Sequence, residues 1–251
     1  MKRNLLDLSD RTILITGGLG ALGRVIGRVL SEHGARLVVN DVLPDHEARS
    51  ILVEEGVAAE RSLYVRADVT SEAGVKALFD TAQQRGFSPQ VVCCHAGVTG
   101  SHPVEAYPLQ QFDALFDINV RAAFAVAQQA VRRWIERGEP GHLIFTTSWV
   151  QDVPWPEITP YNASKAALKS IMRGFARELA PRRIRANAIA PGIVAAGMAL
   201  RQWENEESYR ARASKAIPLG YLQPPESVAH AFLFLCSDMA SYMTGSVLLV
   251  D

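Results

Sequence analysis

The sequence of 251 residues contains few cysteines and no excess of charge of either sign. Its three cysteines are Cys93, Cys94 and Cys236; an adjacent pair in an odd total argues against a disulfide framework and favours a reducing compartment. Lys and Arg together number 26, as do Asp and Glu, so the formal net charge is zero. A nucleic-acid partner requires clustered positive charge to neutralise phosphates, and this balance argues against one.

Long apolar runs and metal-binding spacings are also missing from the sequence. No uninterrupted apolar run approaches the ~20 residues that span a bilayer, so we expect no membrane partner. Neither a Cys-x-x-Cys pair nor a His-Glu-x-x-His motif occurs, so no metal site is expected. The N-terminal M-K-R-N-L-L-D-L-S-D starts with basic residues but lacks the apolar core and cleavage site of a secretory signal. Together these absences predict a cytoplasmic protein.

The sequence does contain a regular alternation of short β-branched runs and longer stretches with helical periodicity. The strand candidates, most of them continuously apolar as buried strands are, are Thr12–Thr16, Arg36–Asp41, Leu63–Asp68, Gln90–His95, Leu143–Thr147, Arg185–Ala190 and Ser246–Val250. The helix candidates are Ala21–His33, Asp45–Glu55, Ser71–Arg85, Leu109–Arg137, Tyr161–Leu179 and Glu226–Cys236. The alternation predicts an α/β protein, a single doubly wound Rossmann-type domain over 1–251, whose seven-stranded, mainly parallel sheet carries helices on both faces.

The segment 195–222 interrupts this alternation with a long, highly charged stretch. Long connections in compact domains are usually lids or binding loops, which predicts a lid over a substrate site. A solvated surface helix with Glu–Arg pairs is an equally acceptable interpretation. The two are compatible, because lids are often short exposed helices.

A glycine-rich turn, Thr16-Gly17-Gly18-Leu19-Gly20-Ala21-Leu22-Gly23, follows the first strand candidate and leads into a helix. Glycines let a backbone approach a pyrophosphate closely, and a helix N-terminus offers free N–H groups with a partial positive charge. Glycine-rich turns are common, so the signal is weak by itself. Its position inside a strand–turn–helix unit favours dinucleotide binding.

Asp41 ends the second strand candidate, 24 residues after Gly17. A carboxylate there can accept hydrogen bonds from an adenosine ribose and would repel a 2′-phosphate. Val42 follows it, where a preference for NADP would favour an arginine. The sequence therefore predicts NAD as the cofactor, with an ordinary strand-end turn residue as the alternative interpretation of Asp41.

Tyr161 and Lys165 are four residues apart in a helix candidate, so both side chains share one face. A phenol needs its pKa lowered by roughly 2–3 pH units to act as a base near neutrality. An ammonium at about 4 Å supplies on the order of 4 kcal/mol, enough for that change when a nicotinium charge assists. Because Tyr-x-x-x-Lys is a common accident of helices, this pair alone assigns nothing.

Other separated motifs accompany the pair. Ser148 directly follows the fifth strand candidate, 13 residues before Tyr161. Asn119 is an amide inside a helix candidate, where asparagine is disfavoured and usually has a specific role. The motifs shared with one family are the glycine turn, Asp41, Asp68-Val69, Ala96-Gly97, Asn119, Ser148, Tyr161 with Lys165, and Pro191-Gly192. In these motifs and their order, over nearly its whole length, the sequence resembles the classical short-chain dehydrogenase/reductase family.

The resemblance implies a role for each matching residue. Tyr161 would be the general acid/base toward the substrate hydroxyl or carbonyl, and Lys165 would lower its pKa and bind the nicotinamide ribose. Ser148 would orient the substrate oxygen, and Asn119 would hold a water of a proton relay. Asp68 and Val69 would flank adenine, and the Val194 backbone would meet the carboxamide. The implied cofactor-binding residues are Gly17, Gly20, Leu22, Gly23, Asp41, Asp68, Val69, His95, Ala96, Gly97, Tyr161, Lys165, Pro191, Gly192 and Val194.

Four positions depart from the family pattern. Ala21 replaces the middle glycine of the usual turn, although Gly20 fits the spacing of extended family members instead. His95 replaces an asparagine; it either donates one hydrogen bond in its place or brings a titratable group beside the cofactor. Ala196 replaces a threonine that commonly helps bind the carboxamide, which puts that contact in doubt. Relatives usually continue beyond the position of Asp251, which leaves open whether a tail is missing from the sequence.

Substrate-pocket residues are expected after Ala96-Gly97, after Ser148 and in the lid segment. They are Val98, Thr99, His102, Trp149, Gln151, Trp155, Met198, Arg201 and Trp203. Tryptophan faces mixed with polar donors suit a sugar or polyol, which is the first prediction; hydroxy acids and acyl or steroid-like ketones are the alternatives. A dinucleotide-binding sensor without catalysis is the rival from another class.

The two long helix candidates 109–137 and 161–179 carry apolar residues on more than one side and must bury a second face. In the resembling family these helices form a subunit interface. The sequence therefore predicts a homotetramer, with a dimer as the alternative.

Overall fold

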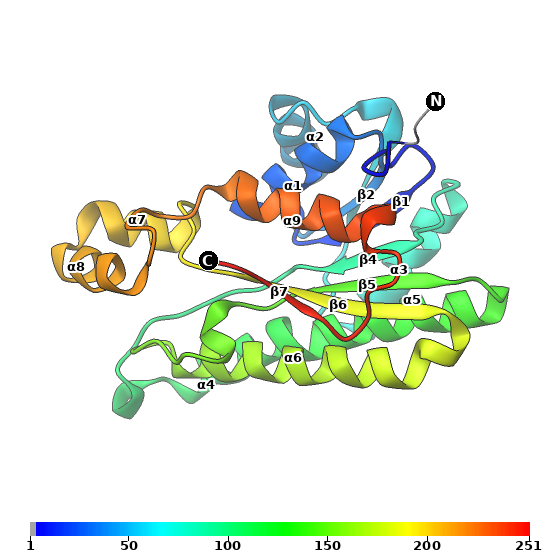
Figure 1. The fold of residues 1–251 in the computed structure, drawn as a ribbon. Coiled ribbons are helices and arrows are strands. Elements are labelled where there is room, and N and C mark those ends of the chain that lie inside the picture. Colours follow the sequence, from blue (N-terminus) through cyan, green and yellow to red (C-terminus); the bar gives the residue numbers. More distant parts are fainter. Residues whose placement is uncertain (1–3) are drawn as a thin grey trace.

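A seven-stranded sheet forms the centre of the protein, which was analysed as a computed structural model that describes residues 4–251 (Figure 1). The strands are β1 Thr12–Thr16, β2 Arg36–Asp41, β3 Ser62–Arg66, β4 Val91–Cys94, β5 Gly141–Thr146, β6 Ile184–Pro191 and β7 Val247–Val250. Their order is β3-β2-β1-β4-β5-β6-β7, and all neighbouring pairs are parallel. The predicted α/β fold is therefore confirmed, with a sheet that is wholly parallel. Residues 1–3, the basic start of the sequence, lie outside the described residues.

Helices cover both faces of the sheet. Their bounds are α1 Ala21–Glu32, α2 Asp45–Glu54, α3 Glu72–Gln84, α4 Leu109–Phe116, α5 Ala123–Arg137, α6 Thr159–Leu179, α7 Gly197–Asn205, α8 Glu207–Ala216 and α9 Pro225–Cys236. Figure 1 shows α1, α2 and α9 on one side of the sheet and α3, α5 and α6 on the other. Two separate hydrophobic clusters fill these two layers, which explains why the strands read as continuously apolar.

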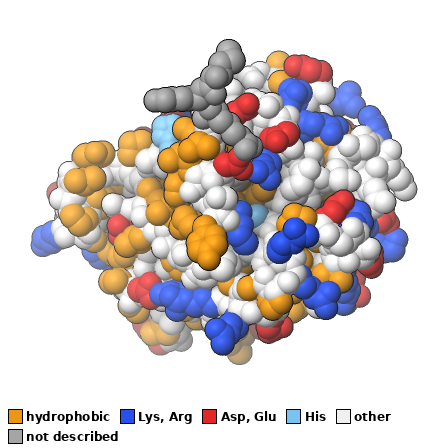
Figure 2. Space-filling view, turned by 45° about the vertical axis from the view of Figure 1, so that its right-hand side comes forward, with side chains coloured by type: hydrophobic (Ala, Val, Ile, Leu, Met, Phe, Trp, Pro, Cys, Tyr) orange, Lys and Arg blue, Asp and Glu red, His pale blue; other side chains and the backbone are white. Residues whose placement is uncertain are grey.

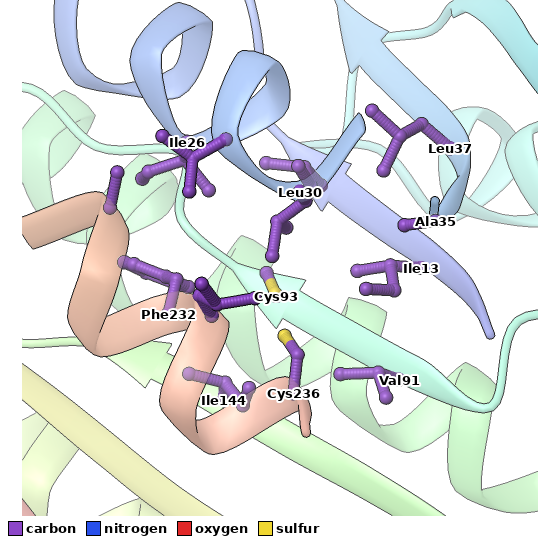
Figure 3. Packing of buried hydrophobic residues seen from close by; sticks show 14 of the residues in the cluster. Ile13, Ile26, Leu30, Ala35, Leu37, Val91, Cys93, Ile144, Phe232 and Cys236 are labelled. Carbon is purple, nitrogen blue, oxygen red and sulfur yellow. The ribbon is translucent and has the colours of Figure 1, made fainter. Parts of the chain in front are cut away.

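The layer under α1 and α9 contains two of the three cysteines (Figure 3). The side chains of Cys93, from β4, and Cys236, from α9, lie next to each other among Ile13, Leu30 and Phe232. All three cysteines are buried and free. They pack as small hydrophobic residues between sheet and helix.

The sheet changes its direction of growth between β1 and β4. β1 pairs with β2 on one side and with β4 on the other, so the connections after β1 and β4 diverge toward opposite edges. In parallel sheets this divergence leaves a crevice at the carboxyl ends of the strands. The predicted site residues follow those ends.

The predicted helix over 109–137 contains an irregularity that the sequence pattern did not indicate. A π-helical segment, Asp117–Ala122, separates α4 from α5. Asn119 lies within it and is fully buried. π-Helical segments frequently occur at functional sites, and this one gives the buried amide the place that a regular helix would deny it.

The predicted lid segment forms α7 and α8, which extend beyond the carboxyl ends of the strands (Figure 1). It is held by a small third cluster around Ile193, Tyr209 and Ala213. On the face shown in Figure 2, acidic and basic side chains are interspersed and hydrophobic ones gather toward the left and centre. Within residues 4–251, no helix is both long and apolar enough to cross a membrane.

Candidate active site

A cavity of about 620 Å³ opens at the carboxyl ends of the strands. Its walls come from the loops after β1 to β6, from the start of α6 and from the lid helices α7 and α8. The sequence-predicted residues that line it are Gly17, Gly20, Leu22, Asp41, Asp68, Val69, His95, Ala96, Gly97, Val98, Thr99, Ser148, Trp149, Trp155, Tyr161, Lys165, Pro191, Gly192, Val194 and Met198. Residues far apart in the sequence thus meet in one place.

The glycine turn after β1 is packed too closely for side chains at three positions. Gly17 has a φ of +64°, and a Cβ there would lie 2.8 Å from Ala96 Cα. A Cβ on Gly18 would lie 2.7 Å from Val39 Cγ1, and one on Gly23 would lie 2.4 Å from the Gly17 oxygen. Gly23 does not line the cavity but lets the turn fold back on α1. Gly18 was not singled out from the sequence because its contact is with another strand.

Ala21, the departure from the family turn, stands at the start of α1 and lines the cavity. It is exposed, so its methyl group enters the cavity wall without displacing the turn. Gly20 caps the helix, and no side chain hydrogen-bonds to the first turn. The N–H groups of that turn therefore remain available to an anion such as a pyrophosphate.

Two carboxylates lie at the end of the cavity formed by β2 and β3. Asp41 accepts hydrogen bonds from the Leu19 N–H through Oδ2 (3.1 Å) and from the Val42 N–H through Oδ1 (2.8 Å). Asp68 accepts from the backbone and hydroxyl of Thr70, and these bonds lower the pKa of its carboxyl group. Asp68 is therefore ionised at neutral pH, since its carboxyl pKa is lowered from a value that already lies far below 7.

Asn119 joins the π-helical segment to the strand end after β4. Its Oδ1 accepts from the Val98 N–H (2.8 Å), and its Nδ2 donates to the Val98 oxygen (2.9 Å) and to Ser164 Oγ (3.1 Å). Gly97 passes so close that a Cβ would lie 3.3 Å from Asn119 Oδ1 and 3.4 Å from Lys165 Nζ. Asn119 does not line the cavity; it fixes the backbone beside Lys165.

Lys165 is buried, with 3% of its surface exposed, and its Nζ donates to the Thr146 oxygen at 2.9 Å. Burial lowers the pKa of its ammonium to about 8. Burial raises the pKa of Tyr161 to about 12, while the hydrogen bond with Ser148 lowers it to a smaller extent. Lys165 Nζ lies 5.4 Å from the centroid of the Tyr161 ring, and burial is the largest influence on the pKa of the phenol. The expected lowering also requires the charge of the oxidised nicotinamide, so it stays a prediction. The phenol here is the proton-donating form.

His95, which stands where the family pattern has an asparagine, forms a hydrogen bond through its imidazole ring. Its Nδ1 lies 2.9 Å from Thr146 Oγ1, and its ring meets Phe232 edge-on. Burial, followed by the charge of Lys165, lowers the pKa of His95 to about 4. The imidazole is therefore neutral at physiological pH, which favours the first of its two interpretations.

The loop after β6 forms the wall opposite the glycine turn. Gly192 donates to Gln223 Oε1 (2.9 Å), and Val194 and Gln223 form an isolated parallel bridge. A Cβ on Gly192 would lie 2.7 Å from Asp251 Cβ, so this position also requires glycine. Gln223 is a positioning residue that the sequence did not reveal, since its partner is 31 residues away.

Aromatic residues line the part of the cavity formed by the loop after β5 and by α8, where the substrate is expected to bind and which is called the substrate end. Trp149 and Trp155 meet edge-to-face at 5.6 Å between ring centroids, and Tyr209 of α8 meets Trp155 at 6.2 Å. Arg212 and Glu157 also line it and were missed. For Arg212 the sequence did offer an indication: it lies three residues after Tyr209, so the two side chains share one face of a helix.

Four residues predicted for the substrate pocket do not line the cavity: His102, Gln151, Arg201 and Trp203. His102 Nε2 lies 2.9 Å from Gln111 Oε1 instead, and Gln151 ends a 3-10 turn whose first residue, Trp149, takes the cavity side. Met198 and Gln202 lie four residues apart on the cavity face of α7, so Arg201 points to solvent. Trp203 packs against the third hydrophobic cluster.

The geometry fits a nicotinamide dinucleotide. The cradle formed by Gly17 and Ala96 leaves no room for side chains, the free end of α1 suits a pyrophosphate, and Lys165 lies beside the bare backbone of Gly97. No group of three or more His, Cys, Asp or Glu side chains in the described chain is placed to hold a metal ion.

Known proteins resemble this chain throughout its length. A family model described as enoyl-(acyl carrier protein) reductase matches residues 18–251. A 3beta-hydroxysteroid dehydrogenase 1 of Eggerthella lenta is 33% identical over 245 residues, which cover 98% of this chain and 94% of that protein.

Two solved structures share the fold and most of the length of this chain. A short-chain type dehydrogenase/reductase from Mycobacterium marinum is 30% identical with a TM-score of 0.89, covering 98% of this chain and 96% of that one. A gluconate 5-dehydrogenase from Burkholderia cenocepacia J2315, in complex with NADP and tartrate, is 28% identical with a TM-score of 0.90 and the same coverage.

Proposed function

The chain belongs to the classical short-chain dehydrogenase/reductase family, and we propose that it interconverts a secondary alcohol and a ketone with NAD. The observation that carries the catalytic assignment is the arrangement of Ser148, Tyr161 and Lys165 along one cavity wall, with Asn119 fixing the backbone behind them. When bound, the nicotinamide dinucleotide supplies or accepts the hydride. The protein's own residues supply the proton chemistry.

Tyr161 Oη is the atom that exchanges a proton with the substrate oxygen. In ketone reduction the protonated phenol donates, which is the form that burial favours. In alcohol oxidation the phenolate must form, and the charges of Lys165 and of the oxidised nicotinamide together offset the cost of desolvation. Ser148 lines the cavity and its side chain hydrogen-bonds to Tyr161, so its hydroxyl is close enough to Tyr161 to orient the same substrate oxygen.

The cofactor is NAD rather than NADP because Asp41 lines the cavity with its carboxylate fixed by Leu19 and Val42. A 2′-phosphate would meet that charge at short range. Asp41→Ser is expected to lower the ratio of NAD to NADP affinity at least tenfold, measured by titrating both reduced cofactors. Asp45→Ser, an exposed change outside the cavity, is the control. Tighter binding of NADP than NAD by the unaltered protein would contradict the assignment.

A sugar or polyol is the first candidate substrate, supported by the similarity to a gluconate 5-dehydrogenase. The second candidate is an alicyclic alcohol of steroid type. It is favoured by the aromatic lining of the substrate end and by the similarity to a hydroxysteroid dehydrogenase. A screen of sugars, polyols, hydroxy acids and hydroxysteroids with NAD, following the reduced cofactor, separates these candidates.

We further propose a cytoplasmic homotetramer in which α5 and α6 form a subunit interface. Phe124 of α5 is 42% exposed and touches Phe175 of α6 edge-on, so an apolar pair faces outward from these helices. Exposed aromatic pairs on two neighbouring helices are typical of interfaces. Light scattering of the purified protein measures the oligomeric state directly.

Tyr161→Phe tests the proposed chemistry. The variant keeps the ring and loses only the proton-carrying oxygen, so turnover is expected to fall by about 10²–10⁴-fold. Binding of the reduced cofactor, measured by fluorescence titration, should change little. A catalytically silent dinucleotide sensor would bind as well but show no turnover before the substitution. Undiminished turnover in Tyr161→Phe would contradict the catalytic assignment.

A further inference from the structure

Arg212 lies on the cavity face of α8, three residues after the buried Tyr209. Its guanidinium carbon stands 5.0 Å from the centroid of the Trp155 ring. Trp155 in turn contacts Trp149, whose neighbour in the sequence is Ser148. A row of aromatic rings therefore leads from the catalytic hydroxyl to a guanidinium at the substrate end of the cavity.

The hydrogen-bonding capacity of this guanidinium is not used up within the described chain. Nε of Arg212 is buried and has no hydrogen-bond partner there. In its ion pair with Glu157, the Nη2–Oε2 distance is 3.6 Å, which is longer than a hydrogen bond. A buried donor without a partner in a cavity wall indicates a group that binds against it.

The charges along the cavity are divided between its ends. Among the described lining residues, Asp41 and Asp68 lie at the cofactor end, and Lys165 is committed to Thr146 and the catalytic tyrosine. Arg212 is the remaining cation, and Glu157 is the one carboxylate beside it. Since a guanidinium presents a planar fork of donors, it matches a planar carboxylate especially well. Glu157 would repel a dianion more strongly than a monoanion.

We propose that Arg212 recognises a carboxylate on the substrate, at the far end of a ring or chain whose other end carries the reacting carbinol. The inference rests on the proposed dehydrogenase function and narrows its substrate class to hydroxy acids. The ring or chain of the substrate between the carboxylate and the carbinol stacks on Trp149 and Trp155. Two sources of this chemistry fit: an alicyclic hydroxy acid, or an acid of the polyol series.

Binding of paired probes tests the proposal without turnover. Cyclohexanecarboxylate is compared with cyclohexanecarboxamide, and gluconate with glucitol, by tryptophan fluorescence in saturating NADH, which cannot oxidise the alcohol groups of the probes. The unaltered protein should bind the acid at least about tenfold tighter than its neutral partner in one of the pairs. The pair that shows the preference identifies the source.

Arg212→Met should weaken binding of the preferred acid by about 10- to 100-fold, as expected for a lost hydrogen bond to a charged group. Its effect on the neutral partner should stay within about twofold. Arg212→Lys keeps the positive charge but lacks the planar set of guanidinium donors, so its affinity for the acid should lie between those of the unaltered protein and Arg212→Met. Arg201→Met is the matched control, because this exposed arginine of the same lid segment does not line the cavity.

Glu157→Gln removes the competing carboxylate. Exposed ion pairs of this kind contribute little, so the acid should bind between about twofold and fivefold tighter. Glu157 has a φ of +68°, which the substitution by glutamine leaves in place, so the loop geometry is matched.

Equal binding of acid and neutral partner by the unaltered protein in both pairs would overturn the proposal. So would an equal loss for both partners in Arg212→Met, which would make Arg212 a latch between α8 and the loop before α6. Neither result touches the proposed function, which fails if the unaltered protein shows no turnover in the substrate screen or if Tyr161→Phe keeps its turnover. The two failures are therefore distinguishable.

Discussion

The catalytic end and the substrate end of one cavity are built in opposite ways. Asn119 and Lys165 are 0% and 3% exposed, and their polar atoms are bonded to backbone or to Ser164. At the substrate end, the side chains of Arg212 and Glu157 are 39% and 46% exposed and meet at 3.6 Å. The residues proposed for catalysis are held by the ends of buried strands between the two helical layers. The residues proposed for substrate recognition depend on the short helices α7 and α8, which pack on a small hydrophobic cluster.

This difference teaches where change is tolerated. A buried group that is fully hydrogen-bonded cannot be altered without leaving its partner unsatisfied. Half-exposed residues on α7 and α8 can be replaced at small cost, since water compensates. The same scaffold can therefore keep its reaction while its substrate changes.

The largest expected effect on stability comes from comparing a tryptophan of the packed core with one of the lid segment. Trp134 is 1% exposed and donates from Nε1 to the Pro89 oxygen at 2.8 Å, whereas Trp203 is partly buried in the lid cluster. Trp134→Ala should lower the free energy of unfolding by about 3–5 kcal/mol, and Trp203→Ala by only ~1 kcal/mol. Chemical denaturation measures both. Equal losses would mean that the lid is as firmly packed as the core.

Gly23→Ala tests the rigidity of the cofactor end. The new Cβ would lie 2.4 Å from the Gly17 oxygen, so the turn must open, and affinity for the reduced cofactor should fall about 100-fold or more, the loss of some 3 kcal/mol. Gly27→Ala on the same helix has nothing within 4 Å of the added methyl group. It should leave affinity unchanged and stabilise the protein by roughly 0.5–1 kcal/mol. Unchanged affinity in Gly23→Ala would show that the turn yields easily.

Lys165→Met tests the cost of the buried charge. Its pKa is lowered by burial from 10.5 to about 8, so the unfolded chain binds more protons between those values, and stability rises with pH across that window. Removing the charge should raise the free energy of unfolding at pH 7 by about 1–3 kcal/mol and flatten this pH dependence. Because the substitution also removes the hydrogen bond from Lys165 to the Thr146 oxygen, we expect an increase near the lower end of this range.

Denaturation at pH 7 and pH 10.5 measures the effect of Lys165→Met. Lys169→Met is the control, because Lys169 lies on the same helix but pairs with Asp152 near the surface. It should neither stabilise the protein at pH 7 nor flatten the pH dependence. A less stable Lys165→Met variant at pH 7 would mean that the hydrogen bond outweighs desolvation.

The fold and the cofactor end were largely predictable from the sequence. Strand ends such as Asp41 and Ser148 follow apolar runs that only a buried strand explains, and parallel strands bring their carboxyl ends to one edge. The substrate end was less predictable. Arg201 and Arg212 are both arginines in one charged segment, but they lie on different helices. The packing of Tyr209 and Ala213 turns α8 so that Arg212 lines the cavity, whereas α7 directs Met198 to the cavity and leaves Arg201 exposed.

By itself, the sequence predicted which residues would carry the proposed chemistry, because strand and helix periods and the spacing of Tyr161 and Lys165 are local properties. Only the tertiary structure decided their state. Burial raises the pKa of Tyr161 and lowers that of His95, so the imidazole is neutral, and Asn119 lies in a π-helical segment that the sequence pattern did not indicate. Desolvation depends on everything packed around a group, which no spacing along the chain records.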